Sequence, residues 1–397
     1  MPTRREVLAG AAAGGALATL GLPSFARAEA AGDARLVVLI LRGGADGLAL
    51  VPAPGDPELF ATRGQINNND DRDDLPLDGF FALHPKLAGI APLWQRQELA
   101  VVHAVQTGYR QRSHFDAQDL LENGLNRVSG LADGWLNRAL GFYAADGSRR
   151  GLAAGAGLPL ILQGPTPVAT WAPRRLPETD AGTLAGLLQL SAGDPQLGAA
   201  LAEGVRAAQG NRALLGELAV QRGGDSVSRE ALARLAEASG RLLSAGDGPR
   251  VATLELGGWD SHGYQKISLS YRVPYLNDML VSLQRGLGPA WADTVVVVVT
   301  EFGRTVAPNG TNGTDHGTAS AALLLGGALR GGRVIADWPG LAPKALYEGR
   351  DLMPTTDLRA VFKGLLIEHL KVDEAYVEAR VFPDSGAIAP LAGLVRA

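Results

Sequence analysis

Six continuous apolar runs limit what this chain can fold into more than any other feature of its sequence. Five of them are 34–44, 99–105, 158–164, 250–258 and 294–303, and a sixth run with the same form follows at 319–327. Runs without alternating polar residues are typical of strands that are buried on both faces, as in parallel sheets. We therefore expect these segments to form the strands of one central sheet.

Helical patterns separate the apolar runs, at about 114–123, 131–144, 181–190, 195–221, 228–245, 267–286 and 355–370. This alternation predicts an α/β fold with a doubly wound, mostly parallel central sheet and helices on both faces. No clear linker divides the chain, so we expect a single domain over residues 29–397. The helical stretch at about 195–245 is expected to be an insertion or a cap. The acidic segment 67–79 is interpreted as a solvated loop rather than a cation site.

Residues 1–28 have the form of an export signal. Paired arginines at 4–5 precede an apolar stretch over 7–22, and Ala-Arg-Ala at 26–28 fits a small-x-small cleavage site. The paired arginines favour the twin-arginine route, which would make the translocase a partner during export. We expect cleavage rather than a short membrane anchor, because the stretch is too short to span a bilayer comfortably. The mature protein is then expected in the periplasm or otherwise exported, with no stable membrane span.

The composition restricts the chemistry that is available. There are no cysteines, so a bound metal needs ligands from His, Asp, Glu or water, and thiolate chemistry is excluded. The formal net charge of −4 argues against nucleic acid as a partner, because phosphate binding needs a basic surface.

Polar side chains collect just after the apolar runs. In chain order they are Asp46, then Arg110, Arg112, Ser113 and His114, then Asp260 and His262, then Glu301 and Arg304, then Asp315 and His316. Ligands of an open parallel sheet bind at the carboxyl ends of its strands. Histidine together with carboxylate suits zinc, manganese or iron, so the pattern predicts a metal site there.

The other three histidines have ordinary structural explanations. His84 precedes a helix-like segment, and His103 lies inside an apolar run, where a core position is expected. His369 lies near the end of a helical pattern, where a cation favours the helix dipole.

Ser113 has two interpretations that are compatible with each other. A serine that directly precedes a helix often caps it by accepting a hydrogen bond from a free backbone N–H. A serine at a helix N-terminus is also well placed to act as a nucleophile on an anionic group, such as a phosphate or sulfate ester. Arg110 and Arg112 would then clamp the anion.

Five motifs resemble one known family. The stretches LRGGADGLAL, RSHFDAQD, GGWDSHG, TEFGRT and GTDHGTA are similar to those of a large bacterial family of twin-arginine-exported proteins known as domain of unknown function 1501. This family is grouped with the alkaline phosphatase and sulfatase superfamily. The resemblance covers essentially the whole mature chain and implies an alkaline-phosphatase-like fold.

The superfamily pattern implies roles for individual residues. Asp46 resembles its aspartate after the first strand, and Ser113 resembles its nucleophile. The pair Asp260 and His262 resembles the ligands of one metal, and His316 matches a later, isolated histidine ligand.

The second metal of the superfamily is bound by an Asp-His pair that follows a long apolar strand. Here that place holds Glu301 and Phe302, and phenylalanine cannot coordinate a metal. The second site therefore lacks a ligand unless His114 or Asp315 compensates. Asp315 is either a partner that orients His316 or a substitute ligand.

Two functions remain in view. The first is an exported hydrolase of phosphate or sulfate esters that uses one or two divalent ions, with zinc or manganese favoured. In it Ser113 attacks a small anionic ester, while Arg110, Arg112 or Arg304 neutralises the ester oxygens. The second is a metal-binding exported protein without hydrolytic activity, such as a binding or assembly factor, which Phe302 favours.

Overall fold

The computed structural model describes residues 33–64, 66, 74–128, 130, 132–143, 151–155, 157–173, 181–191, 193–194, 198, 201, 213–219 and 228–396. The predicted signal at 1–28 lies outside the described residues, as does most of 195–227. Within the described ranges, no helix is both long enough and apolar enough to cross a bilayer.

The strands are β1 (Arg35–Arg42), β2 (Leu75–Pro76), β3 (Ala82–Leu83), β4 (Leu99–Gln106), β5 (Gly151–Ala154), β6 (Val168–Trp171), β7 (Val251–Gly257), β8 (Thr294–Thr300), β9 (Ser320–Leu325), β10 (Arg333–Ile335) and β11 (Thr356–Asp357). The α-helices are α2 (Gly47–Leu50), α3 (Glu58–Arg63), α4 (Pro92–Gln95), α5 (His114–Asn123), α6 (Trp135–Leu140), α7 (Ala181–Ser191), α9 (Arg229–Ser244), α10 (Gln265–Leu287), α11 (Leu358–Gly364) and α12 (Glu374–Tyr376). Short 3-10 helices include η2 (Pro85–Leu87), η3 (Gly141–Tyr143), η4 (Leu160–Leu162), η5 (Gly216–Ala219), η6 (Gly288–Asp293) and η7 (Pro343–Ala345), and two π-helical turns are η8 (Leu365–His369) and η9 (Val377–Val381).

One large sheet forms the centre of the molecule. Its strand order is β10-β4-β9-β8-β1-β7-β5-β6, and β11 pairs with β4 outside this path. The pair β2-β3 forms a separate antiparallel hairpin. In the large sheet, β9 alone among the described strands runs antiparallel, against β4 on one side and β8 on the other. The predicted α/β class with a mostly parallel sheet is confirmed.

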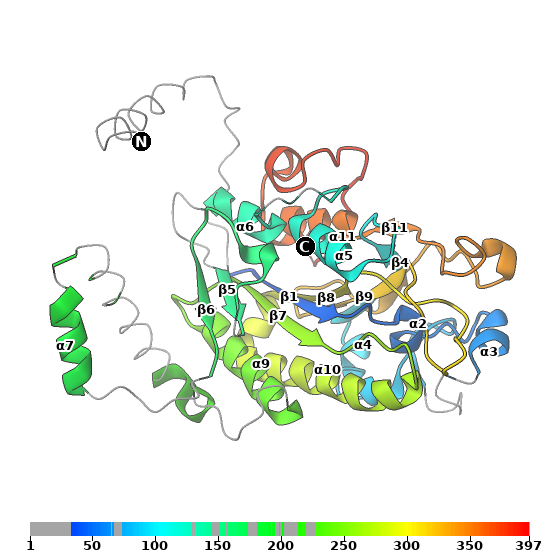
Figure 1. Cartoon of the computed structure of the whole chain (residues 1–397), viewed down its shortest axis with the longest axis horizontal. Helices are drawn as coiled ribbons and strands as arrows, with labels where there is room; N and C mark the ends of the chain where they lie inside the picture. The colour runs from blue at the N-terminus through cyan, green and yellow to red at the C-terminus, as the bar shows by residue number, and fades with distance from the viewer. Residues whose placement is uncertain are drawn as a thin grey trace, which may run out of the picture.

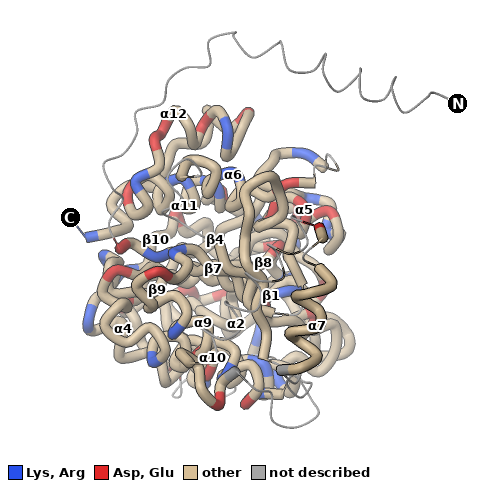
Figure 2. The backbone as a smooth tube through the Cα atoms, turned by 90° about the vertical axis from the view of Figure 1, so that its left-hand side faces the viewer, with Lys and Arg blue, Asp and Glu red and all other residues tan. Residues whose placement is uncertain are grey.

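Two apolar layers enclose the sheet, one on each face. One layer packs α4, α9 and α10 against residues such as Leu39 and Val298. The other packs α6, α11 and η9 against residues such as Val38 and Val297. Successive β-strand residues point to opposite faces, so strands covered on both sides are apolar without interruption. Figures 1 and 2 show the helices on the two sides of the sheet, as predicted.

Figure 2 marks the charged positions along the backbone. Basic and acidic positions both occur throughout that view. This distribution is consistent with a chain of small net charge.

Several predicted elements have the expected bounds. The apolar runs at 34–44, 250–258 and 294–303 contain β1, β7 and β8. The predicted helix 114–123 is α5 itself, which ends where Gly124 adopts the left-handed conformation. A glycine in that conformation is a common helix terminator, because it has no Cβ to clash.

The predicted strand at 158–164 is wrong. Its centre forms η4, and the sheet instead contains β5 and β6 on either side of that segment. Ile161 and Leu162 are buried against α6, and the Ile161 N–H donates to the Glu122 carboxylate, 3.0 Å away. A short apolar run shows that a segment is buried but does not distinguish a strand from another buried conformation.

Two predicted helices are shorter than expected. The pattern at 131–144 gives α6 and η3, because Gly134 is extended. The pattern at 355–370 begins with β11 before α11 and η8. Of the predicted insertion at 195–245, α9 packs along α10 in the layer beneath the sheet.

Candidate metal centre

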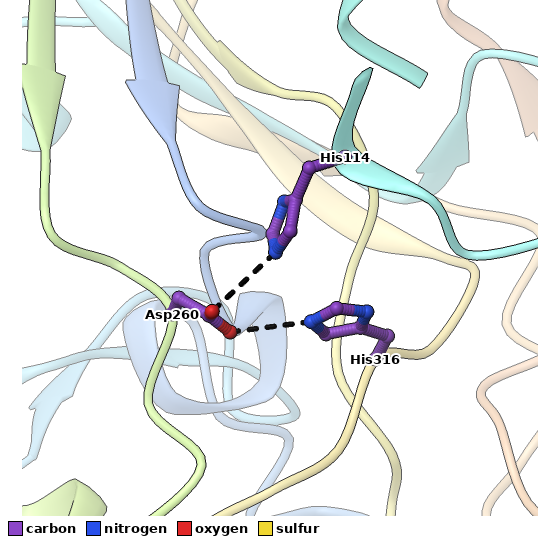
Figure 3. A group of neighbouring side chains, drawn as sticks. All are labelled: His114, Asp260 and His316. Atoms are coloured by element: carbon purple, nitrogen blue, oxygen red, sulfur yellow. Dashed lines mark hydrogen bonds and ion pairs between the residues drawn. The ribbon is translucent and has the colours of Figure 1, made fainter. Parts of the chain in front are cut away.

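Three polar side chains converge beyond the carboxyl ends of β1, β7 and β8. His114, Asp260 and His316 each offer one ligand atom, and these atoms lie within 4.8 Å of one another. Figure 3 shows the two imidazole rings directed at the two oxygens of Asp260. The three residues come from α5, from the loop after β7 and from the loop before β9, so the fold rather than local sequence brings them together.

The direction of β9 explains why His316 lies at this edge. In a parallel strand, a residue that precedes the strand lies at the opposite edge of the sheet from the carboxyl ends. Because β9 is antiparallel to β8, the loop 301–319 leaves the sheet and returns to it at the same edge. His316 therefore reaches the site from the amino end of its strand.

His114 is the first residue of α5, and its ring is held by Glu301. Its Nδ1 lies 2.9 Å from Glu301 Oε1. Its Nε2 is buried without a hydrogen-bond partner and faces Asp260 Oδ2 at 3.5 Å. The hydrogen bond to Glu301 outweighs burial and raises the pKa of His114. A carboxylate behind a histidine in this way fixes the ring and makes the other nitrogen a stronger ligand.

His316 is held in the same sense by a backbone carbonyl. Its Nδ1 lies 2.9 Å from the carbonyl oxygen of Arg112, which can only accept a hydrogen bond. Its Nε2 lies 3.2 Å from Asp260 Oδ1. Burial lowers the pKa of His316, which favours the neutral ring that binds metals.

His262 is a fourth member of the group. Its Nδ1 lies 3.2 Å from Asp315 Oδ1. Its Nε2 lies 3.0 Å from Asp260 Oδ1 and 2.9 Å from His316 Nε2. Asp315 thus orients His262 rather than His316, and its alternative role as a substitute ligand remains a prediction. The hydrogen bond from Asn309 and then that to His262 lower the pKa of Asp315 despite partial burial.

These contacts place several acceptors face to face. A neutral imidazole carries one proton, so a ring that donates from Nδ1 presents a lone pair at Nε2. With all three rings in that form, three Nε2 lone pairs face the Asp260 carboxylate, which also accepts the Arg304 N–H. A single added proton would relieve one of these contacts, whereas a divalent cation would relieve all of them.

The spacing of the ligand atoms also fits a small ion. Ligands about 2.0–2.1 Å from a tetrahedral zinc lie roughly 3.3 Å from one another. The separations among His262 Nε2, His316 Nε2 and Asp260 Oδ1 are 2.9, 3.0 and 3.2 Å, and His114 Nε2 lies 3.5 Å from Asp260 Oδ2. A set of three histidines and one aspartate is therefore compatible with zinc or a similar ion.

Asp260 is positioned by Arg304. Burial alone would raise the pKa of Asp260, but the hydrogen bond and charge of Arg304 outweigh it and lower that pKa. Arg304 Nη1 donates to Asp260 Oδ1 at 2.9 Å, and its other nitrogens donate to the Thr314 hydroxyl and carbonyl. Arg304 is thus buried and uses three of its five N–H donors inside the protein, whereas the sequence suggested that it contacts substrate.

Asp46 and Glu301 have other partners than an ion. Arg63 is buried and pairs with both Asp46 oxygens, and Gln265 Nε2 donates to Asp46 Oδ2 at 2.6 Å. Glu301 Oε1 accepts from His114, Gln118 and the Gly43 N–H. Neither carboxylate is in the converging group, so their assignment as metal ligands remains a prediction.

Phe302 fills the position where the superfamily pattern has a ligand. Its buried ring lies 4.8 Å from the His114 ring and 5.0 Å from the His316 ring, measured between centroids. An apolar ring there supports the geometry of the two histidines and supplies no donor atom. The described residues thus form one group of ligands at this edge.

Ser113 occupies the N-cap position of α5 without capping it. Its side chain makes no hydrogen bond to the first turn of the helix, and it lies near Tyr109, four residues earlier. The Tyr109 hydroxyl donates to Asp116 Oδ2 at 2.8 Å. The capping role suggested by the sequence is therefore absent, and the hydroxyl stays outside the helix.

The two arginines before Ser113 differ in their partners. Arg112 is paired with Asp351 at 2.8 Å and with Glu348 at 2.6 Å. Arg110 lies over the Tyr347 ring, 5.5 Å from its centroid, and its buried Nη1 has no hydrogen-bond partner. Arg110 thus has a buried donor without a partner among the described residues.

Sequence reasoning missed the residues that hold this site together. Arg63 and Gln265 bond to Asp46, Gln118 bonds to Glu301, and Thr314 bonds to Arg304. None of these four residues belongs to a pattern with a recognisable spacing. The Asn- and Gly-rich sequence around Gly313 indicated a tight loop. A Cβ at Gly313 would lie 2.2 Å from the His262 backbone, so the loop needs glycine there. Of the three other histidines, His84 caps η2 and His103 lies in the core, as expected, and buried His369 bonds through Nε2 to the Arg35 carbonyl.

Comparisons with known proteins place the chain in a family. Two solved structures are similar: a phosphonate monoester hydrolase of Agrobacterium radiobacter, at 14% identity and TM-score 0.38 over 85% of this chain and 74% of that chain, and the zinc complex of the C-terminal periplasmic domain of EcEptC from Escherichia coli, at 9% identity and TM-score 0.36 over 77% of each chain. These scores are low, and no property of either protein is carried over. No curated protein matches the sequence. Residues 103–381 match the model of one family, so the chain belongs to the family described as "Protein of unknown function (DUF1501)".

Proposed function

We propose that the protein is an exported metal-dependent hydrolase of phosphate or sulfate esters. The observation that carries the proposal is the convergence of three imidazole Nε2 atoms on the Asp260 carboxylate. His114, Asp260, His262 and His316 would hold one divalent ion, with zinc or manganese favoured by the ligand types. A bound ion would supply positive charge to stabilise an attacking or leaving oxygen.

The chain's own residues supply the other parts of such a reaction. Ser113 is adjacent to His114, and its hydroxyl lies near Tyr109 and is not used as a helix cap. The free N–H groups of the first turn of α5 favour an anion beside it. Arg110 has the unused guanidinium donor that an ester oxygen requires. Ser113 would attack, and Arg110 would hold the ester oxygens.

A second candidate is a metal-binding exported protein that does not hydrolyse esters. Phe302 and the internal pairing of Asp46 favour it, because together they leave no ligand set for a second ion among the described residues. This candidate keeps the same single ion and differs only in turnover.

One experiment tests the proposal and separates the two candidates. The purified chain is analysed for metal content and then assayed with 4-nitrophenyl phosphate and 4-nitrophenyl sulfate, with and without added zinc or manganese. We expect about one ion per chain and turnover that Ser113→Ala abolishes. One ion without turnover of either ester would support the binding protein. Metal below about 0.2 per chain that added ions do not restore would contradict both.

A further inference from the structure

An open hollow of about 460 Å³ lies at the beginning of α10. Its lining residues are Tyr264, Lys266, Ile267 and Asn312, none of which is a member of the metal centre. Tyr264 follows His262 by two residues, and Asn312 precedes Asp315 by three. The hollow therefore lies close to His262 and Asp315 along the chain.

Backbone hydrogen bonds join the hollow to His262. The N–H groups of Tyr264 and Gln265 donate to the carbonyls of Thr311 and Asn312, at 3.0 and 2.9 Å. The Thr311 hydroxyl donates to the His262 carbonyl at 2.7 Å. The wall of the hollow and the backbone of His262 thus form one connected framework.

The metal centre is most open at His262 and Asp315. The side chains of His262 and Asp315 are 47% and 51% exposed, whereas that of His114 is 24% exposed. An ester bound to the ion would have its reacting group among the histidines, and the rest of the molecule would extend past the exposed His262, two residues before Tyr264 of the hollow.

Tyr264 has two features that folding alone does not explain. Its φ of 47° is in the left-handed region, which is unfavourable for a residue with a side chain. Its ring is 69% exposed, so burial of the ring contributes little to stability. A glycine would relax this backbone, and strained residues of this kind occur often at functional sites. Ile267 beside it is also exposed.

We propose that the hollow is a subsite for a flat apolar group, such as an aryl ring, on the ester that binds at the metal centre. This inference rests on the proposed function and specifies its substrate class. The Tyr264 ring and the Ile267 side chain would pack on the two sides of the group. Asn312 and Lys266 would form the polar edge of the subsite.

The test compares aryl and methyl ligands in the wild type and two variants. Tyr264→Gly removes the ring and relieves the strained backbone, so the variant is expected to fold. Tyr271→Ala is the matched control, because Tyr271 is an exposed tyrosine of α10 outside the hollow. With zinc-loaded protein, kcat/KM is measured for phenyl and methyl phosphate, and Kd is measured by calorimetry for phenylphosphonate and methylphosphonate.

We expect the wild type and Tyr271→Ala to prefer the phenyl ligand, and Tyr264→Gly to lose about five-fold of that preference, the size of one aromatic contact. Turnover with equal preference in the wild type and Tyr264→Gly would overturn the subsite and leave the proposed function standing. No turnover, but a phenyl preference in Kd that Tyr264→Gly loses, would support the subsite and contradict the hydrolase. Absence of binding by both phosphonates would overturn the subsite as well.

Discussion

Glu301 shows how a buried carboxylate can act on a metal site without touching the metal. Burial would raise its pKa, but hydrogen bonds from His114 and Gln118 outweigh burial and lower it, so Glu301 stays ionised. An ionised Glu301 requires a proton on His114 Nδ1, which leaves Nε2 free to bind. The tautomer of His114 is therefore set by its neighbour.

Glu301→Gln tests this role. The amide keeps the shape of the side chain but offers an N–H as well as an oxygen, so it no longer enforces the Nδ1-protonated ring. We expect zinc affinity to fall about 10- to 100-fold, as is typical when the partner of a ligating histidine is removed. The measurement is a competition titration with a chelator.

The control for this prediction is Glu255→Gln. Glu255 pairs with Arg42 and lies outside the ligand group. Its zinc affinity should equal that of the wild type. An unchanged affinity in Glu301→Gln would mean that Glu301 has no influence on the ligand.

Two histidines outside the metal centre make stability depend on pH. Burial lowers the pKa of both His84 and His103 from 6.5 to about 4. The unfolded chain takes up these protons near pH 6.5, whereas the folded chain does not until the pH reaches about 4. The free energy of unfolding therefore falls as the pH falls from about 6.5 to about 4, and the full stabilisation is present above 6.5.

His84→Asn removes one of these titrations with little change in structure. His84 Nδ1 accepts a hydrogen bond from the Lys86 N–H, and an asparagine oxygen can replace it. Between pH 6.5 and 4, the free energy of unfolding of the variant should fall less steeply with pH than that of the wild type. The two slopes should differ by at most one bound proton, or about 1.4 kcal/mol per pH unit. Chemical denaturation at several pH values measures both slopes, and identical slopes would contradict the prediction.

At the scale of elements, the loop 301–319 depends on close backbone contact with the loop after β7. The Gly313 carbonyl accepts from the Asn309 N–H, and the Gly313 N–H donates to the Asn309 side-chain oxygen. A Cβ at Gly313 would lie 2.2 Å from the carbonyl carbon and oxygen of His262. Real Cβ atoms do not approach backbone atoms so closely. The two loops can pack together only with glycine at this position.

Gly313→Ala should therefore separate the loops and displace His262. We expect a loss of stability of about 1–3 kcal/mol, typical of overpacking, together with weaker zinc binding. Gly310→Ala is the control, because a Cβ there meets nothing within 4 Å. Thermal unfolding and zinc titration of both variants give the result, and equal behaviour of the two would refute the packing argument.

The elements also show what the sequence can predict. The bounds of β1, β8 and α5 follow from continuous apolar runs and from the glycine that ends α5. The direction of β9 does not follow, because an apolar run is the same read in either direction. The prediction of a strand at 158–164 was wrong because burial alone does not distinguish a strand from a 3-10 helix.

The same limit applies to the site. The sequence predicts that His114, Asp260, His262 and His316 gather at one edge, because they follow or precede strands of the sheet. It does not separate ligands from supporting residues. Glu301 and Asp315 each face the Nδ1 atom of a histidine rather than the point where the Nε2 atoms converge. This difference depends on distances between loops that are far apart in the chain.

For the whole molecule, metal binding should be measurable as stability. The ligands come from α5, the loop after β7 and the loop before β9, and these are separate in an unfolded chain. An ion that binds only the folded state stabilises it by about 2.7 kcal/mol at 100 times its Kd. We expect Tm to rise with zinc concentration and to fall on addition of a chelator.

His316→Ala should remove this dependence of Tm on zinc. In His84→Asn, Tm should still rise with zinc concentration. His84 caps η2 and is not a member of the ligand group. A Tm that does not respond to zinc in the wild type would contradict the assignment of the centre.

The antiparallel course of β9 has a consequence for how this part of the chain tolerates change in length. The loop 301–319 is anchored at both ends by neighbouring strands, so residues added near its tip lengthen a loop that is already closed. Such an addition costs only a few tenths of a kcal/mol in chain entropy. The place of His316 is fixed from both sides, because Ser320 begins β9 four residues later and Gly303 and Thr305 bond to the backbone at 315–318. Changes in length are therefore expected at the loop tip near Gly310, where an added Cβ would meet nothing within 4 Å.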